Sequence, residues 1–169
     1  MSIIGFFEDD GGREKAGYPD VRDDCLVRAI AIATDTPYRK AYRFVSNEMK
    51  ARGFSVDGLR FKNSKTRTTN PRTAQYQVIQ KAGFEKVRQR QRAKKLTYTE
   101  ADKKYGPSII VCTTDHVAAI VKGTLRDEHD GRTYTFCALH GFRCEGECPG
   151  IQRQERKASS IFSFKGGKI

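Results

Sequence analysis

The chain has 169 residues, of which 37% are hydrophobic and 31% are charged. This size suits one globular domain with a single core. No apolar run approaches the roughly 18 residues needed to cross a bilayer, so we expect no membrane-spanning helix. The 32 Lys and Arg against 20 Asp and Glu give a net charge of +12, which favours polyanionic partners such as nucleic acid or an acidic protein.

Residues 1–10 have no basic start and no long apolar stretch, so we do not expect them to form a signal peptide. We therefore expect the protein in a reducing cytoplasm. The five cysteines agree, because their number is odd and a chain of this length builds a core without disulfides. We expect one domain over residues 1–169, with an irregular N-terminal segment at 1–22 and a flexible tail at 149–169.

Two helices are expected in the first third of the chain. Residues 25–34 are almost wholly apolar and rich in Ala, and they follow an Asp pair able to cap free amides, which predicts a short buried helix. Residues 37–53 carry an apolar stripe at helical spacing, with Asp35 or Thr36 as the cap. Residues 53–70 are rich in Gly, Lys, Thr and Asn, which is typical of a loop.

Two further helices and then strands are expected. Residues 71–83 begin with Pro and end with Gly, and Thr97 and Glu100 form a capping-box pattern that predicts a short helix to about Tyr105. From residue 108 the apolar pattern changes. Strand-like runs separated by turn residues follow at 108–113, 117–121 and 132–136. This order predicts an α+β fold, with an N-terminal helical half packed on a C-terminal antiparallel sheet.

Cys25, His116 and Asp127 are the candidate catalytic residues. A thiol is a weak nucleophile until it becomes a thiolate, which a helix N-terminus and a nearby imidazole both promote. Cys25 lies at the expected start of the first helix, and His116 lies far away in sequence at the expected start of a strand. A base also needs a group that orients it. Asp127 lies one hairpin further on and is preferred for that role, with Asp130 as the alternative.

Two segments carry a resemblance to a known family. Residues 24–34, Asp-Cys-Leu-Val-Arg-Ala-Ile-Ala-Ile-Ala-Thr, resemble the nucleophile helix of a group of papain-like proteins common in bacteriophages and bacteria. Residues 116–127, His-Val-Ala-Ala-Ile-Val-Lys-Gly-Thr-Leu-Arg-Asp, are similar to the strand of that group that carries its His, with a small turn that leads to an Asp. The similarity spans roughly residues 23–136, and bacteriocin leader peptidases attached to export transporters share the architecture.

The resemblance implies a papain-like fold and a triad of Cys25, His116 and Asp127. It also implies acyl transfer, usually hydrolysis of a peptide or isopeptide bond in a protein or peptide substrate, with no cofactor or metal required. A phage-encoded chain would act in the host cytoplasm or the virion. Relatives commonly place a Gln six residues before the nucleophile to donate to the oxyanion, and here that position is Pro19. The oxyanion hole then needs the backbone amide of Cys25 and another donor.

A basic stretch at residues 86–95 supports an alternative function. If this stretch is extended, Arg88, Arg90 and Arg92 project from one face, where they could contact the phosphates of a nucleic acid without reading its sequence. The same charges also suit an exposed strand edge, where they block unwanted pairing. The alternative to an enzyme is therefore a catalytically inactive papain-like module that binds nucleic acid or a protein through its basic surface.

A second cluster of cysteines lies near the C-terminus. Thiolates and imidazoles are the ligands that tetrahedral zinc prefers, and four such residues occur close together: Cys137, His140, Cys144 and Cys148. Their spacing is more compressed than the usual two close pairs separated by a longer stretch, so we prefer a Cys-containing segment without metal. Cys112 lies in the middle of an apolar run and is expected in the core.

Overall fold

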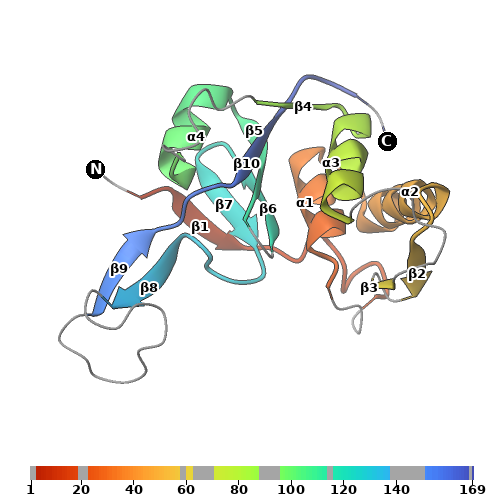
Figure 1. The fold of residues 1–169 in the computed structure, drawn as a ribbon, viewed down its shortest axis with the longest axis horizontal. Helices are drawn as coiled ribbons and strands as arrows, with labels where there is room; N and C mark the ends of the chain where they lie inside the picture. Colours follow the sequence, from red (N-terminus) through yellow and green to blue (C-terminus); the bar gives the residue numbers. More distant parts are fainter. Residues whose placement is uncertain are drawn as a thin grey trace.

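The computed structural model describes residues 3–18, 23–57, 60–62, 71–87, 96–113, 116–137, 151–167 and 169. Within this part of the chain, four helices and a six-stranded sheet form a mixed α+β structure (Figure 1). The helices are α1 (Cys25–Ala33), α2 (Tyr38–Ala51), α3 (Pro71–Lys81) and α4 (Tyr98–Tyr105). The strands are β1 (Gly5–Glu8), β2 (Ser55–Asp57), β3 (Arg60–Lys62), β4 (Phe84–Lys86), β5 (Ser108–Cys112), β6 (Val117–Val121), β7 (Thr124–Asp127), β8 (Thr133–Cys137), β9 (Ile151–Glu155) and β10 (Ser160–Phe164).

The large sheet has the strand order β1-β7-β6-β5-β10-β4. Every neighbouring pair in it is antiparallel except β1 and β7, which run parallel. The expectation of a purely antiparallel, C-terminal sheet is therefore wrong, because β1, from near the N-terminus, pairs parallel to β7, and β4 comes from the middle of the chain. The strand expected at 132–136 is β8, which forms a separate hairpin with β9 outside this sheet. β2 and β3 form a second hairpin inside the segment that was expected to be a loop.

Helices cover both faces of the large sheet. On β5, Ile110 and Cys112 join the core cluster formed with α1, α2 and α3, whereas Ile109 and Val111 join the cluster that contains residues of α4. Figure 1 shows α1, α2 and α3 gathered on one side of the sheet and α4 on the other. A strand buried on both faces has no polar side to alternate with, which explains why β5 and β6 are continuous apolar runs.

Local sequence signals explain where the shorter helices begin. At the start of α4, the side-chain oxygen of Thr97 accepts from the backbone N–H of Glu100 at 3.2 Å, and the backbone N–H of Thr97 donates to the Glu100 carboxylate at 2.8 Å. The predicted capping box and the helix to Tyr105 are thus confirmed. The third expected helix is also confirmed as α3, which begins at Pro71. No helix in the described part of the chain is long and apolar enough to cross a membrane.

The expectations for the two ends of the chain are corrected by the sheet. Residues 1–22 were expected to be irregular, but they contain β1. Residues 149–169 were expected to be a flexible tail, but they contain β9 and β10, and β10 lies between β5 and β4. Ile161 and Phe162 on β10 are fully buried in opposite core clusters. The chain then packs on the turn before β4, where the backbone N–H of Lys165 donates to the carbonyl of Gly83 at 3.0 Å.

Replacing Ile161 on β10 by Ala tests whether this segment belongs to the core. The change removes a side chain that is 0% exposed, and such losses lower the free energy of unfolding by about 2–5 kcal/mol. The matched control is Lys165→Ala on the same segment, at an exposed side chain, which should change that free energy by no more than about 0.5 kcal/mol. Chemical denaturation measures both, and equal small effects would mean that the segment is a tail after all.

Candidate active site

Three elements bring the candidate residues to one end of the sheet. Cys25 is the first residue of α1, His116 directly precedes β6, and Asp127 is the last residue of β7. The strands β6 and β7 are antiparallel neighbours joined by a tight turn, so the start of one lies beside the end of the other. Because α1 packs against β6, its first turn completes the group. The structure therefore brings together residues that are far apart in sequence.

His116 connects the other two side chains. Its Nε2 atom forms a hydrogen bond with Oδ2 of Asp127, and the side chain of Cys25 lies close enough to the ring to help raise the pKa of His116. Since Nε2 is occupied by Asp127, Nδ1 is the ring nitrogen left for Cys25. The His116 side chain is 34% exposed, and Cys25 is partly exposed. The thiol and the imidazole therefore lie at the surface, where a substrate can reach them.

The hydrogen bonds of His116 favour its protonated form. The hydrogen bond with Asp127 is the largest cause, and the hydrogen bond with Cys25 is the second; together they outweigh burial and raise the pKa of His116 to about 10. At neutral pH the ring is then an imidazolium. The imidazolium and the N-terminal end of α1 both place positive charge near the side chain of Cys25.

Asp127 stays ionised although it is buried. Burial acts to raise the pKa of its carboxyl group, but the contacts with His116 and Arg28 and the backbone N–H of Glu128 outweigh burial, and the pKa lies below its ordinary value. Asp130, the alternative, is exposed and pairs instead with Arg132, whose Nη2 lies 2.7 Å from its Oδ2. The geometry thus favours Asp127 over Asp130 as the partner of His116.

Asp24, which precedes Cys25, does not act as a helix cap. It occupies the N-cap position of α1, but its side chain makes no capping hydrogen bond. The carboxylate is fully buried and accepts from Arg28 at 2.6 Å, from the Tyr38 hydroxyl at 2.8 Å and from Arg13 at 3.4 Å. Burial, together with the hydrogen bond to Asp24, raises the pKa of Tyr38 above its ordinary value, so that the hydroxyl remains a donor. The expected cap is therefore wrong, because buried cations compete for the carboxylate.

Arg28 is the residue of this region that sequence reasoning missed. It is the only charged side chain in α1, and it is 6% exposed. Its Nη1 atom lies 2.6 Å from both Asp24 and Glu128, and Nη2 lies 3.2 Å from Asp127. The available signal was a lone Arg in an otherwise apolar helix, four residues after an Asp. Such spacing places opposite charges side by side on a helix.

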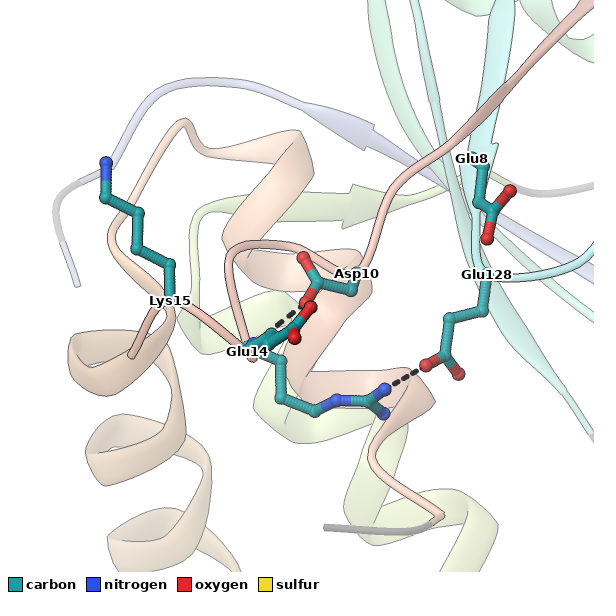
Figure 2. Close-up of a pocket in the computed structure, with 6 residues that line it drawn as sticks. Glu8, Asp10, Glu14, Lys15 and Glu128 are labelled. Atoms are coloured by element: carbon teal, nitrogen blue, oxygen red, sulfur yellow. Dashed lines mark hydrogen bonds and ion pairs between the residues drawn. The ribbon is translucent and has the colours of Figure 1, made fainter. Parts of the chain in front are cut away.

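A pocket of about 690 Å³ opens beside this network. It is lined by Glu8, Asp10, Arg13, Glu14, Lys15 and Glu128. In Figure 2, Glu8 and Glu128 lie on one side of the pocket, Asp10 and Glu14 lie in the middle, and Lys15 points away on the other side. An ion pair joins Arg13 to Glu128, which also contacts Arg28. The pocket thus gathers four carboxylates on a chain whose net charge is +12.

Several other predicted residues stand apart from this site. Cys112 is fully buried, as expected, and burial raises the pKa of its thiol to about 12. Pro19, the basic row of Arg88, Arg90 and Arg92, and the cysteine cluster's His140, Cys144 and Cys148 lie outside the described residues. Cys137 is the last residue of β8. Within the described ranges, no group of three or more His, Cys, Asp or Glu side chains is arranged to hold a metal ion.

Comparisons with protein-family models, with curated proteins and with solved structures found no match to this chain. The papain-like resemblance therefore rests on the two motifs quoted above.

Replacing Asp127 by Asn tests the electrostatic part of this site. Without the carboxylate, the pKa of His116 should fall from about 10 toward the ordinary value of about 6.5, so that the ring is largely neutral at pH 8. NMR titration of the imidazole C–H resonances measures this pKa, and His116→Gln assigns the signal among the 3 His residues. Asp130→Asn should leave the titration unchanged, since Asp130 pairs with Arg132. A larger effect of Asp130→Asn would make Asp130 the partner.

Proposed function

We propose that this protein is a cysteine hydrolase in which Cys25 is the nucleophile, His116 the base and acid, and Asp127 the residue that orients the imidazole. The observation that carries the proposal is the continuous chain of side-chain contacts from the thiol through the ring to a buried carboxylate. Nucleophile, base and orienter in hydrogen-bonding contact are the signature of covalent acyl-transfer sites. The charged form of His116 adds the electrostatic activation that a thiol needs.

The reaction we propose has two stages. The Cys25 sulfur attacks the carbonyl carbon of an amide, and the His116 imidazolium gives its proton to the departing amine, which leaves a thioester on the sulfur. Neutral His116 then takes a proton from water, and the resulting hydroxide attacks the thioester to release the acid and regenerate the thiolate. The backbone N–H of Cys25 lies in the first turn of α1, where amides have no partner within the helix, and it can donate to the oxyanion.

We further propose that the substrate is a peptide or isopeptide bond and that the fold is papain-like. Support comes from the resemblance of residues 24–34 and 116–127, and from the order of a nucleophile helix followed by His and Asp on neighbouring strands. A nucleophilic thiol works only when reduced, which favours a reducing compartment such as the cytoplasm. Transfer of the acyl group to an amine instead of water would use the same thioester.

Alkylation tests the nucleophile. Iodoacetamide should modify Cys25 at neutral pH faster than it modifies glutathione, because the imidazolium favours the thiolate. His116→Ala should slow this reaction by at least about tenfold. The matched control is His129→Ala, at an exposed His outside the site, which should leave the rate unchanged. Peptide mass spectrometry follows the labelling of each cysteine. Equal rates in wild type and His116→Ala would refute the thiolate–imidazolium pair.

Turnover of a simple acyl ester distinguishes a hydrolase from an inactive binding module with a reactive thiol. With p-nitrophenyl acetate, wild type should release p-nitrophenol well beyond one equivalent per chain, because water resolves the thioester. Cys25→Ala should abolish this release. A burst that stops at one equivalent would mean that the thiol is acylated but that the site does not complete hydrolysis, which would favour the binding module.

A further inference from the structure

Arg28 is placed to control the third member of the proposed triad. It lies three residues after Cys25 in α1, so the two side chains leave neighbouring positions on the helix surface. Its guanidinium reaches across to the end of β7 and the residue after it, where Nη2 lies 3.2 Å from Asp127 and Nη1 lies 2.6 Å from Glu128. An ion pair thus links α1, which carries Cys25, to Asp127, which contacts His116.

The two oxygens of Asp127 have separate partners. Oδ1 accepts from Arg28 Nη2 at 3.2 Å and from the backbone N–H of Glu128 at 2.9 Å, whereas Oδ2 faces Nε2 of His116. Donors on Oδ1 from a helix and from the backbone leave the carboxylate no freedom to rotate about its Cβ–Cγ bond. With Oδ1 held, Oδ2 has one position, and that position sets the direction of the imidazole ring.

We propose that Arg28 is a positioning residue, which fixes Asp127 and through it holds His116 in register with Cys25. This inference rests on the proposed function, since it names a further residue of the same site. The guanidinium does not touch the reacting atoms. Through its ion pair with Asp127, Arg28 links α1 to the end of β7. This link fixes the position of the imidazole relative to the thiol.

The chemistry of Arg suits this role better than that of Lys. A planar guanidinium carries its donors in a fixed fork, whereas an ammonium is a single point charge, and here two terminal nitrogens serve three carboxylates. The Nε atom of Arg28 is buried and has no hydrogen-bond partner among the described residues. A buried donor without a partner lowers the free energy of unfolding. The contacts of the two terminal nitrogens are therefore the contribution of Arg28 to the site.

Arg28→Lys tests the proposal because it keeps the charge and removes the fork. If Arg28 positions Asp127, the hydrogen bond between Asp127 and His116 weakens, and the pKa of His116 should fall by at least about one unit from its wild-type value. Alkylation of Cys25 at neutral pH should slow by at least about tenfold. The pKa is read by NMR titration, so it does not depend on any activity. An unchanged pKa together with an alkylation rate within about twofold of wild type would overturn the proposal.

The matched control is Arg52→Lys, which alters another Arg with a partner four residues earlier: Arg52 is the C-cap residue of α2, and its Nη1 lies 2.8 Å from Glu48. It should lower stability slightly and leave the pKa of His116 and the reactivity of Cys25 unchanged. If Arg28→Lys does not fold, the same readouts apply to the double variant Asp24→Asn with Arg28→Lys, which removes one of the three carboxylates that a single ammonium would otherwise have to serve. Slow alkylation in wild type would refute the proposed function, whereas normal wild-type reactivity with no effect of Arg28→Lys would refute only the positioning role.

Discussion

The arrangement of this molecule depends on one buried charge, the guanidinium of Arg28. α1 is apolar on every side except at this residue, and a buried cation is tolerated only when anions and hydrogen-bond acceptors surround it. Asp24, Asp127 and Glu128 supply them from two segments that are far apart in sequence. A buried ion network of this kind adds little net stability, but it strongly disfavours any packing that would leave one of its charges alone. The angle and position of α1 on the sheet are therefore specified by charge as well as by shape.

The catalytic geometry follows from that constraint and from the sheet. β5 and β6 are buried on both faces, so their register is fixed by packing against α1 on one side and α4 on the other. The turn between β6 and β7 then brings His116 and Asp127 together at one end of the sheet. The ion pairs of Arg28 hold the first turn of α1 at that same end of the sheet. Cys25 therefore lies beside His116. Packing thus brings the three elements together, and the ion network aligns their side chains.

The sequence predicted the elements whose signals are local. The buried α1, the capping box of α4 and the apolar strand β6 are short patterns whose meaning does not depend on distant residues. The contact of His116 with Asp127 was expected from the hairpin spacing. The position of β10 was missed, because five residues flanked by charges resemble a tail until the gap between β5 and β4 is known.

Charge partners were harder to predict than elements. Asp24 matched the pattern of a helix cap, yet its carboxylate is bonded to Arg28 and Tyr38 instead. Local helix-capping rules assume that the carboxylate of such an Asp accepts from the free amides of its own helix. In the buried environment of Asp24, the Arg28 guanidinium and the Tyr38 hydroxyl donate to that carboxylate instead. Arg28 was given no role from the sequence, because its partners Asp127 and Glu128 lie 99 and 100 residues further along the chain.

The most direct test of the central claim, that Cys25, His116 and Asp127 act as one unit, is a double-mutant cycle on the alkylation rate of Cys25. The rate is measured in wild type, His116→Ala, Asp127→Asn and the double variant at the same neutral pH. Asp127 acts on the thiol only through the imidazole, so Asp127→Asn should slow alkylation when His116 is present and have no further effect when it is absent. If the two effects multiplied instead, the residues would act independently, and the account of a connected triad would be contradicted.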